Sequence, residues 1–294
     1  MSNPHKAGFV NIIGHPNVGK STLMNHLVGE RLSIITPKAQ TTRHRILGIV
    51  NQPDYQIIYS DTPGIIDPAY KMQEGMMKFV YASLQDADIV LLMLESGQKE
   101  LKDKKLNDFL SNTELPVLLL INKIDLSNQE QLESEINHWK AIYPKAIVLP
   151  ISALHGFNIE MLQKYLIDLL PESPPYYPKD TLTDKSERFF VEEKIREKIL
   201  MNFGQEIPYS IEVYVDTFKE SESIIKIRAI IYTARESQKA ILIGKGGNKL
   251  KKVGTDARKD LEAFFEKQLF LELFVKVNKD WRNDESQLKR FGYL

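Results

Sequence analysis

Residues 14–21 read Gly-His-Pro-Asn-Val-Gly-Lys-Ser and lie between an apolar run at Phe9–Ile13 and a helix-like stretch at Thr22–Val28. A glycine-rich turn between a strand and a helix is typical of a phosphate-binding loop, because backbone N–H groups of the turn converge on an anion. In such a loop Lys20 reaches the β- and γ-phosphates, and the Ser21 hydroxyl ligates Mg²⁺. The residues expected to contact the nucleotide here are Gly14, His15, Pro16, Asn17, Val18, Gly19, Lys20, Ser21 and Thr22.

Length and composition indicate a soluble protein with sizeable cores. The chain has 294 residues, of which 43% are hydrophobic and 27% are charged, and this suits one or two domains; we expect two. No cysteine is present, which excludes disulfides and thiolate metal sites, and the six histidines show no metal-ligand spacing. Residues 1–8 lack an apolar signal core, and no run approaches the length of a membrane span. We therefore expect a cytosolic protein that is at most peripheral to a membrane.

The first 170 residues alternate between buried-strand patterns and amphipathic helix patterns. Strands are expected at Phe9–Ile13, Ile46–Val50, Tyr55–Tyr59, Ile89–Leu94, Val117–Ile121 and Ile147–Ile151, and helices at Lys71–Leu84, Lys102–Ser111, Gln129–Ile142 and Ile159–Leu170. This alternation predicts an α/β domain with a mainly parallel sheet, whose ligands bind at the carboxyl ends of the strands. The further motifs of this part lie at the ends of predicted strands.

The run Asp61-Thr62-Pro63-Gly64 follows the third predicted strand. By itself it fits an ordinary Asp-containing turn. Behind a phosphate-binding loop, the Asp61 carboxylate is expected to hold Mg²⁺ through water, and the Gly64 N–H to meet the γ-phosphate, because glycine has no Cβ to block the approach. Thr62, Pro63 and Ile65 complete this part of the nucleotide site.

Asn122-Lys123-Ile124-Asp125 follows the fifth predicted strand and is expected to select the base. The Asp125 carboxylate can accept hydrogen bonds from N1–H and the exocyclic amine of guanine, whereas adenine offers neither donor and leaves the carboxylate unpaired. Lys123 would lie over the base and Asn122 would tie the loop to the phosphate-binding loop. Ser152 and Ala153 end the sixth strand, where the Ala153 N–H can donate to guanine O6.

Thr41 and Thr42 lie in a polar segment before the second predicted strand. This position is that of a switch loop, in which one threonine ligates Mg²⁺ when the γ-phosphate is present, and we select Thr42. The alternative is a solvated basic loop whose threonines only begin a strand. The expected magnesium ligands are thus Ser21, Thr42 and Asp61, and the residues expected to act in hydrolysis are Lys20, Thr42, Asp61 and Gly64.

A proline-rich stretch, Pro171–Pro178, has four prolines in eight residues and marks a linker. Beyond it a helix is expected at Ser186–Phe203, strands at Ile211–Val215 and Ile224–Ile231, a long helix from Asn248 to about Gln268, and a last strand at Leu271–Val277. The order predicts a smaller α+β domain.

Gly244-Lys245-Gly246-Gly247 precedes the long helix and has the form of the Gly-x-x-Gly clamp of a KH domain, which grips single-stranded nucleic acid. Between Lys226 and Asp260 stand ten basic and three acidic residues, inside a chain whose net charge is zero. That excess predicts binding of RNA phosphates, while a solvated helix is the alternative. The residues expected to bind RNA are Lys239, Gly244, Lys245, Gly246, Gly247, Lys249, Lys252 and Arg258.

These motifs, together with Gln40–His44, Asp61–Ile65, Ser237–Lys239 and Ala257–Lys259, resemble the Era-type GTPases over essentially the whole chain. The resemblance implies a P-loop GTPase domain at 1–170, a linker at 171–185 and a type II KH domain with a C-terminal tail at 186–294. It further implies a Mg²⁺-dependent GTPase that binds near the 3′ end of small-subunit ribosomal RNA and assists assembly of the 30S-type subunit. It also implies peripheral association with the inner face of the cell membrane, and we expect a monomer.

Ile65 stands where small signalling GTPases have the glutamine that orients the attacking water, so hydrolysis is expected to be slow or assisted. Asn17 offers one form of assistance, because its side-chain carbonyl can ligate K⁺ beside the β- and γ-phosphates. The alternative is that Asn17 only braces the loop by bonding to the backbone. The competing function is a signalling or membrane-associated switch whose second domain binds protein.

Overall fold

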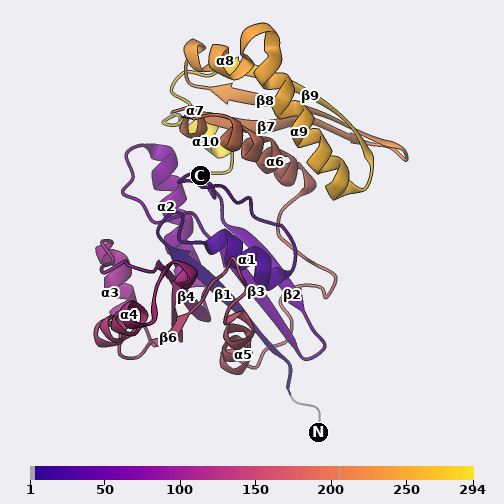
Figure 1. Cartoon of the computed structure of the whole chain (residues 1–294). Helices are drawn as coiled ribbons and strands as arrows, with labels where there is room; N and C mark the ends of the chain where they lie inside the picture. Colours follow the sequence, from indigo (N-terminus) through magenta and orange to yellow (C-terminus); the bar gives the residue numbers. More distant parts are fainter. Residues whose placement is uncertain (1–3, 205) are drawn as a thin grey trace. The chain divides into compact units, whose positions relative to one another are not determined.

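The structure is a computed structural model that describes residues 4–204 and 206–294 (Figure 1). Contacts between residues divide the chain into two compact units. The second unit comprises Ile34–Thr41, Pro68–Gly75 and Lys185–Leu294, and the first holds the other described residues up to Asp184. Two short segments of the N-terminal half therefore group with the C-terminal part of the chain.

The first unit is built on a six-stranded sheet with strand order β2-β3-β1-β4-β5-β6. Its strands are β1 (Lys6–Gly14), β2 (Ile46–Asn51), β3 (Tyr55–Asp61), β4 (Ile89–Glu95), β5 (Val117–Asn122) and β6 (Ile147–Pro150), and its helices are α1 (Lys20–Val28), α2 (Lys71–Gln85), α3 (Lys104–Asn112), η1 (Ile124–Leu126), α4 (Gln129–Ile142) and α5 (Ile159–Leu169). The first residues of α2 group with the second unit. All neighbouring strands are parallel except β2, which is antiparallel to β3. The predicted α/β class with a mainly parallel sheet is confirmed.

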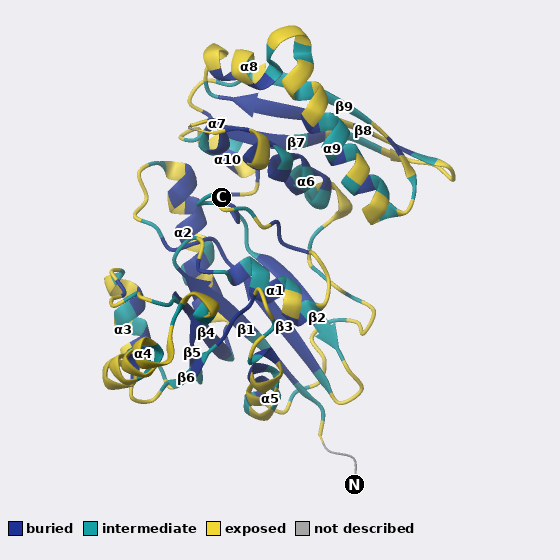
Figure 2. Ribbon diagram, in the orientation of Figure 1, coloured by how far each residue is buried: buried dark blue, intermediate teal, exposed yellow. Residues whose placement is uncertain are grey.

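Burial explains why the central strands are nearly continuous apolar runs. The first six residues of β4 are buried, because helices cover both faces of a parallel sheet. Figure 2 shows the central strands dark blue and the outer faces of α3, α4 and α5 largely yellow. Side chains cap the N-termini of several helices. At α3, Asp103 accepts a hydrogen bond from the Leu106 N–H at 2.8 Å, and at α4, Asn128 accepts one from the Gln131 N–H at 2.9 Å.

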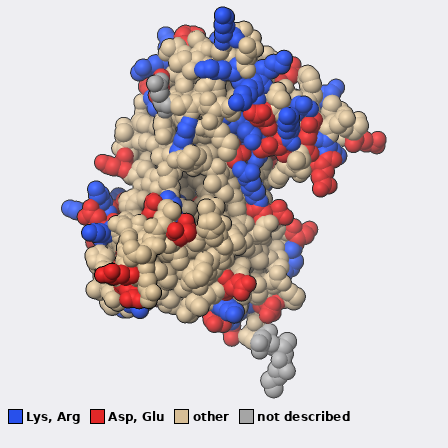
Figure 3. Space-filling view, in the orientation of Figure 1, with Lys and Arg blue, Asp and Glu red and all other residues tan. Residues whose placement is uncertain are grey.

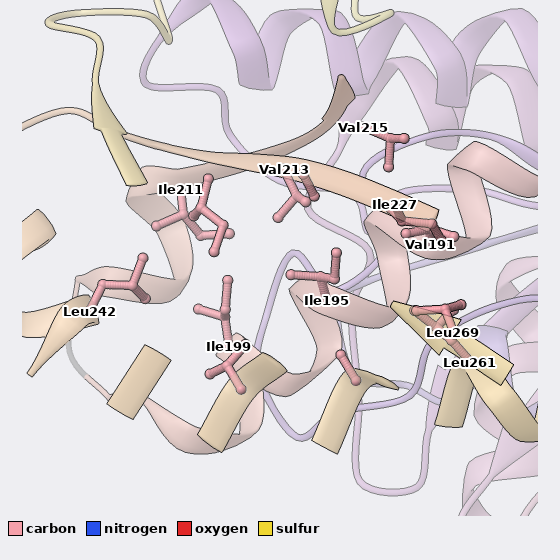
Figure 4. Packing of buried hydrophobic residues seen from close by; sticks show 14 of the residues in the cluster. Val191, Ile195, Ile199, Ile211, Val213, Val215, Ile227, Leu242, Leu261 and Leu269 are labelled. Carbon is pink, nitrogen blue, oxygen red and sulfur yellow. The ribbon is translucent and has the colours of Figure 1, made fainter. Parts of the chain in front are cut away.

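The second unit is a three-stranded sheet, ordered β7-β8-β9, packed against helices. Its elements are α6 (Glu187–Asn202), α7 (Ile207–Ser210), β7 (Ile211–Glu220), β8 (Ile224–Thr233), α8 (Glu236–Ile243), η2 (Lys245–Gly247), α9 (Asn248–Phe265), β9 (Gln268–Val277) and α10 (Glu285–Arg290). Alternate residues of the strands meet the apolar faces of α6 and α9; in Figure 4, Ile211 and Val213 of β7 face Ile195 and Ile199 of α6. The predicted α+β class of this part is also confirmed.

Several boundaries in the second unit differ from the sequence prediction. The long helix ends at Phe265, because Glu266 adopts a left-handed conformation with φ 51°. β9 begins at Gln268, three residues before the predicted Leu271, since its whole length pairs with Ile224–Thr233 of β8. β7 runs on to Glu220 across a register shift between Val215 and Thr217. The short helices α7 and α10 have no clear periodic pattern and were not expected.

The segment after the proline-rich stretch lies along the edge strand β2. The Ile49 N–H donates to the Leu182 carbonyl at 2.8 Å, and the Leu47 N–H donates to the Asp184 carboxylate at 2.9 Å. An exposed strand edge is thereby covered by the chain itself. Within the described residues, none of the helices combines the length and the apolar character that crossing a membrane requires.

Glu192 of α6 should make the stability of the protein depend on pH. Burial raises the pKa of its carboxyl to about 7, against the bond that it accepts from the Val215 N–H at 2.7 Å. Because the folded-state pKa is raised, the carboxyl costs no stability below its unfolded pKa of 4.5, and the cost grows as pH rises through 7. The side chain is only partly buried, so we expect Glu192→Gln to gain roughly 1 kcal/mol relative to the parent at pH 8, and nothing near pH 4.

Thermal unfolding of both proteins across pH 4–8 measures this difference. A constant difference between the two proteins over the whole range would contradict the assignment to Glu192.

Candidate functional sites

The phosphate-binding loop joins β1 to α1, and its shape depends on positive φ angles. Gly14 and Gly19 have φ 153° and 105°, and a Cβ on either would collide with Met93 or Asn122. Asn17 also lies in the left-handed region, with φ 64°. His15, Pro16 and Val18 fill the turn, and Thr22 stands in the first turn of α1. The loop therefore forms as predicted, and its glycines cannot be replaced without displacing neighbours.

Lys20 is buried at the start of α1. Its Nζ donates to the carbonyls of Gly14 at 3.0 Å and His15 at 2.9 Å. Burial lowers the pKa of the Lys20 ammonium to about 8, and the nearby charge of Asp61 acts in the opposite direction. An anionic phosphate in the loop would favour the charged form of Lys20 and so offset the cost of burying the ammonium. The buried lysine therefore fits a polyphosphate ligand.

Ser21, Thr42 and Asp61 are brought together from α1, the segment before β2 and the end of β3. Ser21 Oγ lies 2.7 Å from Asp61 Oδ2 and 2.8 Å from Thr42 Oγ1, and Thr42 Oγ1 donates to Asp61 Oδ2 at 3.3 Å. Two hydroxyls and a carboxylate are oxygen ligands of the kind that Mg²⁺ prefers. Thr41 instead shares its hydroxyl with Thr36 and the Lys38 carbonyl. The geometry thus supports the choice of Thr42.

Asp61 carries a further sign of an ion site. Its carboxylate is fully buried, and among the described residues Oδ1 has no hydrogen-bond partner. Burial raises the pKa of this carboxyl, while Lys20 and the Ser21 and Thr42 hydroxyls pull it down. A buried carboxylate oxygen without a partner is costly, and a divalent cation would satisfy it. The residues present therefore fit Mg²⁺.

The segment after Asp61 runs directly past the phosphate-binding loop. The Ile65 N–H donates to the Gly14 carbonyl at 3.0 Å, and a Cβ on Gly64 would stand 2.7 Å from Pro16. The Thr62 hydroxyl anchors the turn by donating to the Ile12 carbonyl at 2.8 Å, and Pro63 joins Thr62 to Gly64. Ile65 itself is only 4% exposed and packs in the apolar core. The isoleucine side chain has no group that can donate or accept a hydrogen bond, so Ile65 cannot orient the attacking water as a glutamine would.

Asn122 links three loops at the carboxyl end of the sheet. Its amide donates to the Val18 carbonyl at 2.7 Å, and its oxygen accepts from the Ala153 N–H at 2.9 Å. The Ser152 hydroxyl donates to Asp125 Oδ1 at 2.7 Å, and this bond holds the pKa of the Asp125 carboxyl below its usual range. A charged, positioned carboxylate therefore stands where a base would be read.

Sequence reasoning missed Glu95, which pairs with Lys123 at 2.9 Å. Glu95 ends β4, and this strand-end position was the available signal. The pair holds the Lys123 stem across the loop, in the place expected for a side chain that covers a base.

In the second unit the Gly-x-x-Gly loop connects α8 to α9 through η2. Gly244, Gly246 and Gly247 have φ 73°, 61° and 78°, a region in which only glycine is comfortable. Lys245 and Gly246 are exposed, and a Cβ on Gly246 would meet no atom within 4 Å. The loop tip is open to a ligand backbone.

A groove of about 350 Å³ extends from this loop between α9 and β9. It is lined by Gly247, Leu250, Lys251, Gly254, Thr255, Arg258, Leu271 and Leu273. Of the predicted RNA-binding residues, only Gly247 and Arg258 line it; Lys239, Gly244, Lys245, Gly246, Lys249 and Lys252 do not. Lys251 was missed, although its spacing from Gly247 and Arg258 places all three on one helix face. The groove combines apolar walls with basic groups, as a single-strand site requires.

Figure 3 shows Lys and Arg side chains gathered where α8 and α9 lie, with acidic side chains among them farther along α9. Some of these charges are neutralised locally: Arg258 pairs with Glu262 at 2.9 Å, and Lys198 with Asp260 at 2.5 Å. The exposed Lys245, Lys249 and Lys251 remain near the loop. The positive field is thus concentrated at the clamp end of the groove.

Comparison with known proteins covers both sites. Residues 9–123 match the family model of a 50S ribosome-binding GTPase, and residues 206–282 match that of a KH domain. GTPase Era of Alkaliphilus metalliredigens is 45% identical over 98% of this chain and 99% of its own length. A crystal structure of Era in complex with MgGDPNP and nucleotides 1506–1542 of 16S ribosomal RNA is 38% identical, with a TM-score of 0.94 over 98% of this chain and 99% of that one.

A second solved structure, a tyrosine-to-alanine variant of Aquifex aeolicus Era bound to GDP and AlF4⁻, is also 38% identical, with a TM-score of 0.91 over 98% of this chain and 99% of that one. Likeness over the full length, with every nucleotide motif and the clamp in place, shows that the chain belongs to the Era family of GTPases.

Proposed function

We propose that this protein binds and hydrolyses GTP with Mg²⁺, binds single-stranded RNA from the 3′ region of the small-subunit ribosomal RNA, and assists assembly of the small subunit. The observation that carries the proposal is that one chain holds both a joined set of nucleotide loops and a groove behind a Gly-x-x-Gly clamp. The Era relative crystallised with MgGDPNP and nucleotides 1506–1542 of 16S ribosomal RNA supports it. The protein acts as a monomer in the cytoplasm and contacts the inner face of the cell membrane peripherally.

With the boundaries proposed from the sequence, residues 1–170 bind the nucleotide, residues 171–185 form the linker and residues 186–294 bind RNA. In hydrolysis Lys20 neutralises charge on the β- and γ-phosphates, and the Gly64 N–H donates to the γ-phosphate. Ser21, Thr42 and Asp61 are the residues that would hold Mg²⁺, and the ion would supply positive charge beside the same phosphates. Asp125 and the Ala153 N–H orient guanine. The intrinsic rate of GTP hydrolysis is slow, because the buried Ile65 has no group that could orient the attacking water.

The switch segments provide the route from nucleotide to RNA affinity. The boundary between the two contact units falls between Thr41 and Thr42. Thr42 bonds Ser21 and Asp61 in the first unit, whereas the Thr41 carbonyl accepts a bond from Arg196 in the second. The peptide bond between Thr41 and Thr42 therefore joins the two units. Ligation of magnesium by Thr42 would act directly on this junction with the RNA-binding unit.

The segment after the Asp61 motif also passes from the first contact unit to the second. Pro68–Gly75 groups with the second unit, where the Met72 N–H donates to the Arg282 carbonyl at 3.0 Å and Lys71 pairs with Glu285 at 2.9 Å. Arg282 in turn lies over the Tyr70 ring at 4.6 Å. Residues 34–41, which precede Thr42, and residues 68–75, which follow the Asp61 motif, thus belong by contact to the second unit. RNA affinity should therefore follow the nucleotide state.

Sequencing the RNA that copurifies with the GTP-loaded protein tests this function. We expect small-subunit 3′ sequences, and weaker recovery with GDP. Binding should also fall steeply as salt rises, because phosphate contacts release counterions. A second domain that binds protein would give no enriched RNA and little salt dependence, and that result would replace the proposed function by a signalling or membrane-associated switch.

Asn17 is expected to make hydrolysis depend on potassium. A K⁺ held by the Asn17 carbonyl would sit where negative charge develops, and we expect hydrolysis about tenfold faster in K⁺ than in Na⁺ at equal ionic strength. Asn17→Ala should remove the difference. The comparison is made with and without RNA, since a partner can order the segment around Thr42. Equal rates of the parent in both salts, in both arms, would leave Asn17 as a brace of the loop.

A further inference from the structure

The three-stranded sheet of the second unit has one face packed on helices and one face turned away from them. Leu269, Leu271, Leu273 and Val275 of β9 belong to or pack on the core that α6 and α9 share. Side chains alternate along a strand, so the residues between these point to the opposite face. The strand register aligns them in rows: Lys219, Lys226 and Phe270; Thr217, Arg228 and Glu272; Tyr214, Ile230 and Phe274; Glu212, Tyr232 and Lys276.

The C-terminal segment covers one end of this opposite face. The Tyr293 hydroxyl donates to Glu212 at 2.7 Å, and the Phe291 ring lies 5.4 Å from that of Tyr232. Arg290 adds a cation over the Tyr214 ring at 4.3 Å. As a result Tyr232 is only 8% exposed. The chain thus seals the apolar residues at this end.

The other end of the face remains open and carries two exposed aromatic rings. Phe270 is 52% exposed and Phe274 is 45% exposed, values far above those of the core phenylalanines. They stand four residues apart on β9, which separates them by about 13 Å along the strand. We call Lys219, Lys226, Arg228, Phe270 and Phe274 the open sheet face. The fold itself does not cover these two rings, so a ligand would be needed to bury them.

Basic side chains surround both rings. Lys226 pairs across the strands with Phe270, and the Arg228 guanidinium lies over the Phe274 ring at 5.6 Å. Lys219 stands beside Lys226, and the exposed Lys276 lies beyond Phe274. The acidic side chains are fewer. Glu272 pairs with Arg228 at 3.4 Å, Asp216 occupies the bulge of β7, and Glu212, in the row of Lys276, accepts the bond from Tyr293 at the covered end. The face is aromatic and net positive.

This composition favours one class of partner. Aromatic rings on a flat sheet stack unpaired bases, and cations between them neutralise the phosphates. A protein partner would favour a centre depleted of lysine, whereas lysine lies directly beside Phe270 here. We propose that the open sheet face is a second contact surface for single-stranded RNA.

The topology places this surface next to the groove. β9 is an edge strand of the sheet. Leu271 and Leu273 line the groove on the helix side, and Phe270 and Phe274 alternate with them on the other side. An RNA strand that leaves the groove can pass round the free edge of β9 onto the rings. A clamp of this type holds about four nucleotides, so the open sheet face binds the nucleotides beyond them.

The inference rests on the proposed RNA binding and is tested with two single-stranded RNA probes taken from the 3′ end of small-subunit ribosomal RNA. One has about four nucleotides, the length of the clamp, and the other about twelve. Binding to the full-length protein is measured by fluorescence anisotropy. Replacing both rings, in Phe270→Ala with Phe274→Ala, should weaken binding of the long probe by about tenfold or more while leaving the short probe unchanged.

Two further variants separate stacking from other effects. Phe270→Leu with Phe274→Leu keeps apolar side chains but removes the rings, and it should lose affinity like the alanine pair. Phe264→Ala removes a ring that is 48% exposed on α9, outside the open sheet face, and should bind both probes like the parent. Basal GTP hydrolysis and thermal unfolding of all variants are compared to verify that they fold.

The outcomes distinguish the inference from the function on which it rests. A parent protein that binds neither probe overturns both. A parent that binds both probes, with unchanged long-probe affinity in the alanine and leucine pairs, overturns only the second surface. Retained RNA affinity together with loss of a copurifying protein from the alanine pair would assign the face to a protein partner and also overturn the inference.

Discussion

Asp125→Asn is expected to weaken GTP binding by two to three orders of magnitude and to remove most of the preference for GTP over ATP. The Asp125 carboxylate is positioned by Ser152 at 2.7 Å, and its pKa is lowered, so it is an anion throughout the neutral range. An anion accepts from both donors of guanine, N1–H and the exocyclic amine. An asparagine can accept only one of these bonds, and its NH₂ group opposes the amine. Competition of unlabelled nucleotides against a fluorescent GTP analogue measures the effect.

The same variant should gain affinity for xanthosine triphosphate. Xanthine carries a carbonyl where guanine has its amine, so the asparagine NH₂ can donate to it while its oxygen accepts from N1–H. Asp108→Asn, an exposed change of the same kind on α3, is the matched control and should leave all nucleotide affinities unchanged. If Asp125→Asn discriminates GTP from ATP as well as the parent does and does not favour xanthosine triphosphate, Asp125 is not the residue that selects the base.

Lys245→Asp combined with Gly246→Asp is expected to abolish RNA binding, with a loss of at least a hundredfold in affinity at low salt. The change places two carboxylates at the exposed tip of the clamp, where a phosphate should approach the backbone. Space does not forbid the substitution, since a Cβ on Gly246 meets no atom within 4 Å. The positive φ of this residue makes the loop somewhat less stable, by roughly 1 kcal/mol, but the domain should still fold. Filter binding of a small-subunit 3′ RNA measures the loss.

A charge-matched control separates local from long-range effects. Lys140→Asp with Asn137→Asp alters net charge equally on the exposed surface of α4 in the first unit. It should bind RNA nearly like the parent, and both variants should keep the parent's basal GTP hydrolysis, because neither touches the nucleotide loops. Undiminished RNA affinity in the clamp variant would remove the KH assignment, and an equal loss in both variants would reduce it to a general effect of charge.

The nucleotide motifs could be recognised from the sequence because their chemistry is local. A phosphate-binding loop needs its glycines, Lys20 and Ser21 within one turn between a strand and a helix, and this spacing is visible in the chain. The parallel sheet then follows from the alternation of strands and helices, and it accounts for the convergence of Asp61, Asn122 and Ser152 at one edge. The residue types, their order and the class of each unit were therefore predictable.

Contacts that join distant parts of the chain depended on the tertiary structure. The pairing of Lys123 with Glu95 and the lining of the groove by Lys251, Leu271 and Leu273 require the neighbouring strand and helix to be in place. Likewise, grouping of Ile34–Thr41 with the second unit cannot be inferred from a polar loop. The open sheet face is the clearest case: alternation places Phe270 and Phe274 on one side of β9, but only packing decides which side the helices cover. A sequence specifies periodicity, whereas burial is a property of the whole assembled core.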